Sequence, residues 1–171
     1  MELAFNNEQI KIRDATQEDH SAIIRITQEV FAESTFEKNI ENHYGIIGDK
    51  DWIWRKTRHL QEDLSHPDGH CLVAASDKRV LGYVTIRLDK QAKIGVIANL
   101  AVTQVAANKG IGRALLKQAE ALMRDVGMEV ARIETLEQNM IGQHLYPQLG
   151  FDEIARQIYF AMDLREQNEN R

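Results

Sequence analysis

The stretch Ile97-Ala-Asn-Leu-Ala-Val102, with the loop 103–109 and the turn Gly110-Ile-Gly112 after it, decides the fold of this chain. Its first part is an apolar strand, and its glycines open a long amphipathic segment. A glycine-bearing turn at a helix start can bind an anion, because unpaired backbone N–H groups and the positive end of the helix dipole meet there. We therefore expect a phosphate-bearing ligand at residues 107–114.

The length of the chain, 171 residues, is that of one domain. Such a length suffices to bury roughly 70% of the unfolded surface in a core. We see no internal repeat, linker or low-complexity tract. The sequence therefore predicts a single domain over residues 1–171, with a folded core at 9–164 and a polar, frayed tail at 165–171.

Composition limits the partners and the compartment. Cys71 is the one cysteine, which excludes a disulfide within the chain and favours a reducing compartment. The N-terminus does not resemble a signal peptide and no apolar run is long enough to cross a bilayer, so we expect a cytoplasmic protein without a membrane partner. A net charge of -5 argues against nucleic acid, whose binders show a basic face.

Apolar periodicity places the elements of the first 70 residues. Alternation predicts a short strand at 10–13, and a capping box opens a helix at Thr16. Residues 33–50 show no firm period, and we interpret them as a helix turn plus loop. Asp51 can cap a second helix, which ends at His66-Pro67-Asp68-Gly69.

Three strands are expected next in antiparallel succession, at 71–75, 80–88 and 94–102. A polar turn separates each strand from the next. In the third strand the pattern predicts that alternate residues share one face. These residues are Ile94, Val96, Ala98, Leu100 and Val102.

The last part of the chain alternates helix and strand. Helical spacing predicts a helix at 111–126, and alternation predicts a strand at 130–136. Because a helix connects them, this strand and the one before the helix should lie parallel in a right-handed crossover. A further helix is expected at 139–149, and a final pair of strands near 152–156 and 158–164.

A set of short motifs occurs in a fixed order over residues 94–164. The set is Leu100-Ala101-Val102, Ala107-Asn108-Lys109-Gly110-Ile111-Gly112-Arg113-Ala114, Asn139, Leu145-Tyr146 and Leu149-Gly150-Phe151. It resembles the GNAT superfamily of acyl-CoA-dependent N-acetyltransferases, in which Q/R-x-x-G-x-G/A follows a strand ending like Leu-Ala-Val. The resemblance implies an α/β (α+β) fold with a mixed, mostly antiparallel central sheet of six to seven strands, flanked by about four helices.

By this resemblance the anion site holds the pyrophosphate of acetyl-CoA, a cosubstrate, and no metal is expected. The pantetheine arm would lie between the two parallel strands where they splay apart. Asn139 could hydrogen-bond this arm, could simply cap a helix, or could do both. The expected cofactor-binding residues are Leu100, Ala101, Val102, Ala107, Asn108, Lys109, Gly110, Ile111, Gly112, Arg113, Ala114, Asn139 and Tyr146.

Ala107 departs from the family pattern, which usually has Gln or Arg at this position. The change removes one side-chain contact. The pyrophosphate, however, is held mainly by backbone N–H groups, which residues 107–113 still offer. We therefore expect a cofactor site of reduced affinity.

Acyl transfer to an amine needs a base for the ammonium group and an acid for the leaving thiolate. Tyr146, which matches the family's tyrosine, is the candidate acid, although it could instead only pack a helix face. Glu134 is the candidate base, directly or through water, and a solvated strand carboxylate is an equal interpretation. Glu137 is the nearby substitute. The N–H of Val102 would stabilise the oxyanion.

Two other patterns do not favour a site. Cys71 lies in an apolar strand, where a free cysteine usually packs and is not a nucleophile. His66 and His70 offer only two ligands, too few to indicate a metal centre.

The resemblance implies an N-acetyltransferase that moves the acetyl group of acetyl-CoA to a primary amine by direct attack in a ternary complex. We favour a small or amino-acid-like amine over a protein N-terminus or lysine. An acyl-CoA-binding regulatory module without turnover is the alternative from another class. A homodimer is compatible with these expectations, and residues 33–66 should shape the acceptor pocket.

Overall fold

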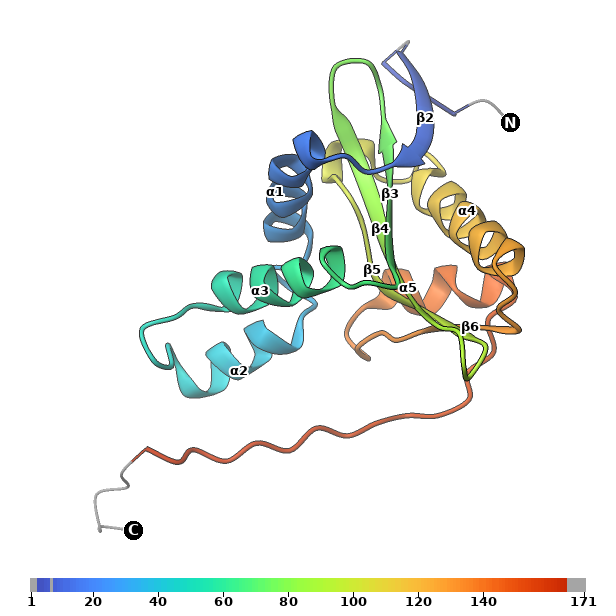
Figure 1. Cartoon of the computed structure of the whole chain (residues 1–171). Helices are drawn as coiled ribbons and strands as arrows, with labels where there is room; N and C mark the ends of the chain where they lie inside the picture. Colours follow the sequence, from blue (N-terminus) through green and yellow to red (C-terminus); the bar gives the residue numbers. More distant parts are fainter. Residues whose placement is uncertain (1–2, 7, 166–171) are drawn as a thin grey trace.

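The computed structural model describes residues 3–6 and 8–165, and within them one sheet is formed in the order β1-β2-β3-β4-β5-β6 (Figure 1). All neighbouring strands are antiparallel except β5 and β6, which are parallel. The mixed, mostly antiparallel sheet and the parallel crossover are therefore confirmed. The strands are β1 Leu3–Phe5, β2 Glu8–Asp14, β3 Gly69–Ala75, β4 Val80–Asp89, β5 Ile94–Val102 and β6 Val130–Ile133.

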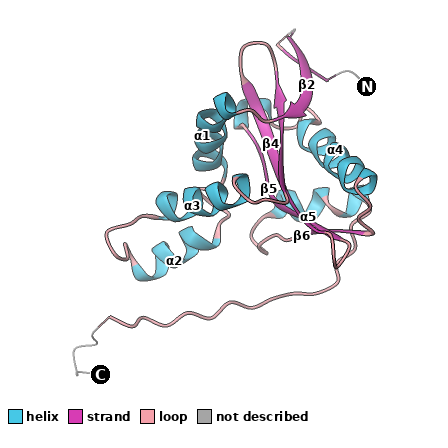
Figure 2. Cartoon of the chain, viewed as in Figure 1, coloured by secondary structure: helices cyan, strands magenta, loops and turns pink. Residues whose placement is uncertain are grey.

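Helices cover both faces of the sheet (Figure 2). The helices α1 and α3 pack on one face and α2 lies against α3, whereas α4 packs on the opposite face. The five α-helices of the described residues are α1 His20–Val30, α2 Phe36–Tyr44, α3 Trp52–Leu64, α4 Ile111–Asp125 and α5 Met140–Leu145. None of them is long and apolar enough to span a membrane.

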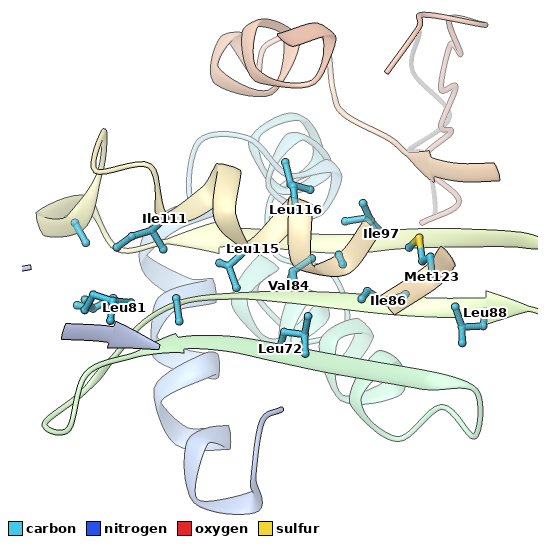
Figure 3. Close-up of a cluster of buried hydrophobic side chains, with 14 of the residues drawn as sticks. Leu72, Leu81, Val84, Ile86, Leu88, Ile97, Ile111, Leu115, Leu116 and Met123 are labelled. Carbon is cyan, nitrogen blue, oxygen red and sulfur yellow. The ribbon is translucent and has the colours of Figure 1, made fainter. Parts of the chain in front are cut away.

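The core has two apolar clusters, one on each face of the sheet. On the α4 face, Leu115 and Leu116 pack against strand residues such as Val84 (Figure 3). On the other face, Ile23 of α1 and Leu60 of α3 are completely buried. Each such side chain contributes about 1.5–3 kcal/mol relative to exposure, so the two clusters hold the sheet between its helical layers.

A bulge divides β5 just before the motif Leu-Ala-Val. Asn99 pairs with Thr85 of β4, but Ile97 pairs with the very next residue of β4, which leaves Ala98 as an extra residue. A bulge resets the alternation of side chains. Ile97 and Leu100 consequently pack in the same α4-side cluster, and the prediction that alternate residues of β5 share one face is wrong.

The elements after α4 are shorter than the sequence predicts. β6 ends at Ile133, although alternation predicted a strand to 136, because its pairing with β5 stops next to the bulge. The predicted helix 139–149 is α5 followed by a separate 3-10 turn at Pro147–Leu149. Pro147 lacks the N–H that would continue the α-helical hydrogen bonds.

The final pair of strands predicted at 152–156 and 158–164 is wrong. Residues 151–164 contain no strand and no helix, and they run as an open segment from the region of β6 across to α2 (Figure 1). Alternating apolar and polar residues would give a strand one apolar face. A strand forms, however, only where the backbone can also pair with the edge of a neighbouring strand. Beyond Arg165, the tail that was expected to be frayed lies outside the described residues.

Candidate active site

The turn before α4 has the geometry of an anion site. Gly110 adopts φ 77°, the left-handed region, and caps the 15-residue helix α4. Asn108 is also left-handed, at φ 59°. Within the described part of the chain, the backbone N–H groups of residues 108–113 have no hydrogen-bond acceptor. These N–H groups and the helix dipole are therefore available to phosphate.

Gly112 marks the point where three predicted parts of the site meet. A side-chain carbon added to Gly112 would lie 3.7 Å from Cγ2 of Val102 and 3.9 Å from Cδ2 of Leu145. The start of α4, the end of β5 and the last turn of α5 thus converge within van der Waals distance. The structure brings together the Leu-Ala-Val, Gly-x-Gly and Leu-Tyr motifs, which are far apart in the sequence.

An opening in the sheet begins beside this convergence. The pairing of β5 with β6 ends at Ile97 and Ile133. Beyond that point, Leu100, Ala101 and Val102 pair only with β4 within the described residues. The backbone of these three residues therefore lies beyond the paired part of β5 and β6, at the strand ends where open α/β sheets bind ligands.

Tyr146 is the C-terminal cap residue of α5, directly after Leu145, which approaches Gly112. Its Cε2 would lie 3.0 Å from a side-chain carbon added to Gly142, and its ring meets the ring of Phe151 edge-on at 6.1 Å between centroids. Burial raises the pKa of the Tyr146 hydroxyl to about 12. The phenol therefore keeps its proton at neutral pH, as a proton donor must.

Asn139 caps α5, as one of the two interpretations from sequence proposed. Its side-chain oxygen accepts a hydrogen bond from the N–H of Gly142 at 3.1 Å. Its amide nitrogen donates to the hydroxyl of Thr135 at 2.9 Å. The capping role is confirmed, and a contact with a pantetheine arm stays a prediction.

Glu134 lies just past β6 with a side chain that is 64% exposed. It forms an ion pair with Arg132 at 2.8 Å. Glu137, the substitute, is more exposed and lies 3.5 Å from Arg156. Neither carboxylate hydrogen-bonds to Tyr146 in the described structure, so the base role of Glu134 stays a prediction.

A buried polar network on the α3 face was not predicted. The ammonium of Lys56 donates to the side-chain oxygen of Asn99 at 2.8 Å. The amide nitrogen of Asn99 donates to Asp63 at 2.6 Å and to the hydroxyl of Thr85 at 2.8 Å. Arg87 pairs with the other oxygen of Asp63 at 3.1 Å. The network fixes Asn99, which lies between the bulge and Leu100.

A carboxylate and an imidazole stand next to this network. Glu37 of α2 is buried, and it hydrogen-bonds to the Thr35 hydroxyl and to Nδ1 of His59, the latter at 2.6 Å. Burial raises the pKa of the Glu37 carboxyl, but the hydrogen bond from Thr35 and the charge of Lys56 oppose this, and the net direction is down. Burial lowers the pKa of the Lys56 ammonium, against the charges of Glu37 and Asp63.

Only part of this network had a signal in the sequence. Lys56, His59 and Asp63 recur at helical spacing on α3, which places them on one face. Their partners Glu37 and Asn99 come from other elements, and no local pattern links them.

Other candidates lie away from the convergence at Gly112. An open hollow of about 610 Å³ extends along the sheet between Arg87 and Arg132, and none of its lining residues belongs to the predicted cofactor or catalytic set. Burial raises the pKa of the Cys71 thiol to about 12, which opposes a nucleophilic role. The described residues include no group of three His, Cys, Asp or Glu side chains arranged to hold a metal.

Comparison with known proteins identifies the family of this chain as one of acyl-group transferases. Residues 29–151 match the acetyltransferase (GNAT) family. The chain belongs to this family, and the resemblance drawn from its motifs is confirmed. The matched range includes every candidate cofactor and catalytic residue and ends at Phe151.

Individual relatives agree with this assignment. Aminoglycoside N(6')-acetyltransferase type 1 of Stenotrophomonas maltophilia is 26% identical over 113 residues, which cover 61% of this chain and 74% of that protein. The PaiA N-acetyltransferase of Thermoplasma acidophilum, solved with coenzyme A, is 25% identical with a TM-score of 0.66, over 84% of this chain and 89% of that one. A putative acetyl transferase of Pyrococcus furiosus shares the fold, with 21% identity and a TM-score of 0.69, over 90% and 99% of the two chains.

Proposed function

We propose that this chain transfers the acetyl group of acetyl-CoA to the primary amine of a small acceptor, by direct attack in a ternary complex. The observation that carries the proposal is the convergence at Gly112 of unpaired N–H groups, the open end of β5 and the helix that bears Tyr146. The coenzyme A complex of the Thermoplasma relative supports the choice of cosubstrate. The Cys71 thiol supports a reducing compartment such as the cytoplasm.

The chain offers distinct groups to each part of this cosubstrate. The N–H groups of residues 108–113 would hold the pyrophosphate. The backbone of Leu100 to Val102 would pair with the pantetheine arm and carry the thioester to the opening between β5 and β6, with Asn139 bordering the arm. Ala107 offers no long side chain, so backbone groups carry most of this binding.

The reaction then requires three proton transfers. Glu134, directly or through water, takes a proton from the acceptor ammonium, and the free amine attacks the thioester carbonyl carbon. The N–H of Val102 stabilises the resulting oxyanion. As the C–S bond breaks, Tyr146, which is protonated at neutral pH, donates its proton to the leaving sulfur. The attacking nitrogen gives up its second proton through water to the Tyr146 phenolate, which yields the neutral amide and restores the phenol.

The acceptor would bind on the face of the sheet that carries α1, α2 and α3. Gln138, beyond β6, donates to the carbonyl oxygen of Glu33 at 3.0 Å and to the side-chain oxygen of Asn39 at 2.9 Å. The segment that leads from α1 into α2 is therefore joined to the loop after β6. The aminoglycoside-acetylating relative supports an amine acceptor.

Thermal unfolding with and without acetyl-CoA tests the cosubstrate. Ligand at about 100 times its dissociation constant adds roughly 2.7 kcal/mol to the free energy of unfolding, so we expect a clear rise in melting temperature. No rise at millimolar acetyl-CoA would contradict the proposal. Stabilisation without CoA release over a panel of aminoglycosides, polyamines, amino acids and peptides would indicate a binding module without turnover.

A further inference from the structure

The imidazole of His59 on α3 and the carboxylate of Glu37 on α2 form a hydrogen-bonded pair, with 2.6 Å between Nδ1 and Oε1. The other oxygen of Glu37 accepts a hydrogen bond from the hydroxyl of Thr35. The side chain of Glu37 is only 10% exposed, whereas that of His59 is 56% exposed. A carboxylate fixed inside the fold thus holds a ring that is more than half open to solvent.

The charge of Glu37 decides which ring nitrogen of His59 carries the hydrogen. Burial raises the pKa of the Glu37 carboxyl, but the hydrogen bond from Thr35 and the charge of Lys56 together outweigh burial, so the net direction is down. An ionised carboxylate only accepts hydrogen bonds, so Nδ1 must donate. In the neutral ring the lone pair therefore lies on Nε2, which has no hydrogen-bond partner among the described residues.

Contacts of α3 place His59 close to the strand that leads into Leu100. His59 lies one helical turn after Lys56 and one turn before Asp63, on the same face of α3. Both neighbours hydrogen-bond to the side chain of Asn99 in β5, at 2.8 and 2.6 Å. The ring is therefore within one helical turn, roughly 5 Å along the axis, of two contacts with β5.

Contacts of α2, which packs beside α3 (Figure 1), place the carboxylate close to the loop after β6. Asn39, two residues after Glu37, exchanges two hydrogen bonds with Gln138, at 2.9 and 3.0 Å. The pairing of β5 with β6 ends at Ile97 and Ile133, before either of these contacts is reached. The imidazole–carboxylate pair therefore lies where the two strands part, on the face proposed for the acceptor.

We propose that His59, oriented by Glu37, selects the acceptor by accepting a hydrogen bond at Nε2 from a second donor group of that molecule. This inference rests on the proposed function: while the amine of the acceptor reaches the thioester, a hydroxyl or a second amino group of the same molecule meets the ring. The acceptor is then an amino alcohol, a diamine or a larger molecule with the same two groups, and not a simple alkylamine.

The chemistry of Nε2 explains the selection. A hydroxyl or an amino group donates to the lone pair and replaces the water bound there. An alkylamine of the same length brings a methyl group to the lone pair, which loses its water without gaining a partner. A single net hydrogen bond corresponds to roughly 3- to 10-fold in affinity.

The ring nitrogens of His59 in the NMR spectrum test the tautomer and the contact, in protein saturated with CoA so that no acetyl group is transferred. At about pH 8, where an ordinary imidazole is neutral, we expect the hydrogen on Nδ1. Amino alcohols of rising chain length are then added, each compared with the alkylamine in which methyl replaces the hydroxyl. At least one amino alcohol should shift the Nε2 signal, and its alkylamine should not. The ring of His20, at the start of α1, is the control and should not respond.

Two spectra would overturn the proposal. One has the hydrogen on Nε2 of His59, which would make this nitrogen a donor. The other has an Nε2 signal that no amino alcohol shifts.

Kinetics by CoA release test the selection with the same series. For the amino alcohol that gives the largest shift, kcat/KM should be roughly 3- to 10-fold above that of its alkylamine. His59→Phe should make the two values equal, with an unchanged circular dichroism spectrum. His59→Gln, whose side-chain oxygen can replace Nε2, should keep part of the difference. Glu62→Gln, an exposed substitution on α3, should keep all of it.

The kinetic outcomes separate this inference from acetyl transfer itself. Equal kcat/KM for both amines in wild type, or an equal fall for both in His59→Phe, would overturn the role of His59 while acetyl transfer remains supported. A shift of the Nε2 signal without any acetylated amine would contradict acetyl transfer while the hydrogen bond to His59 remains supported.

Discussion

The ammonium of Lys56 donates a hydrogen bond to the side-chain oxygen of Asn99 at 2.8 Å, and this contact joins α3 to β5 directly beside the bulge. Asn99 is buried, and its amide nitrogen is already bound to Asp63 and Thr85. Every polar atom of the Asn99 side chain is therefore satisfied. A group held in this way fixes the strand that leads into Leu100.

Lys56→Met should destabilise the fold. The substitution leaves the oxygen of Asn99 buried without its donor, which costs about 1–3 kcal/mol. Urea unfolding at neutral pH measures this change in the free energy of unfolding. Arg58→Met is the matched control on α3. Arg58 forms an exposed ion pair with Glu62 and lies over the exposed ring of Trp54, so its loss should cost less than about 1 kcal/mol. Equal effects of the two substitutions would contradict a structural role for the Lys56 contact.

Asp19 should make the fold less stable in acid. Hydrogen bonds from Arg13, and then from Thr16, hold the pKa of the Asp19 carboxyl well below its usual range. A lowered folded-state pKa contributes stability above the unfolded pKa of about 3.9, and this stability is lost as the pH falls below that value. Asp19→Asn should therefore lose about 1–3 kcal/mol at neutral pH.

Urea unfolding of wild type and Asp19→Asn at about pH 7, 5 and 3 checks the Asp19 effect. The difference between them should stay large at the two higher values and shrink at the lowest. Asp77→Asn, in the exposed turn between β3 and β4, should change stability by less than about 0.5 kcal/mol. A difference for Asp19→Asn that does not change with pH would exclude the ionised carboxylate as its source.

Tyr146→Phe should lower turnover and leave the KM for acetyl-CoA nearly unchanged. The phenol proton is lost while the ring still packs on Gly142 and Phe151. A general acid typically contributes about 10²–10⁴-fold, so a fall of at least about 100-fold is expected. Steady-state kinetics by CoA release measures it. Tyr159→Phe, in the open segment 151–164, is the control, and unchanged turnover in Tyr146→Phe would remove Tyr146 from the acid role.

Glu134→Gln should alter the pH dependence of turnover. If Glu134 takes the amine proton, the limb of the pH–rate curve that rises toward alkaline pH should move or disappear. The profile is compared with that of Glu129→Gln, an exposed glutamate at the start of the same strand region. A Glu134→Gln profile identical to wild type would transfer the base role to water or to Glu137.

The parts of the site that sequence could predict are those with a local physical cause. Gly110 takes a left-handed φ that glycine allows, and Asn139 caps the helix that follows it. The parallel pairing of β5 and β6 followed from the helix between them. The first two signals lie within a few residues of the features they predict, and the third is the segment that directly connects the two strands.

The parts that sequence could not predict depend on distant partners. In the sequence, nothing distinguishes Asn99 from the other residues of an apolar strand. Its hydrogen-bond partners Lys56 and Asp63 nevertheless lie 43 and 36 residues earlier in the chain. The bulge that reverses the faces of β5 leaves no mark in the hydrophobic pattern. In residues 152–164 apolar and polar residues do alternate. The pattern does not specify, however, which strand of the sheet this segment could pair with.

The most direct test of acetyl transfer is mass spectrometry of the acceptor. The chain is incubated with acetyl-CoA and a panel of primary amines that includes aminoglycosides, and each amine is weighed before and after. We predict that at least one amine gains the mass of one acetyl group, with one CoA thiol released per product, and that Tyr146→Phe slows this gain. No acetylated amine from a chain that acetyl-CoA stabilises against heat would contradict the proposed reaction.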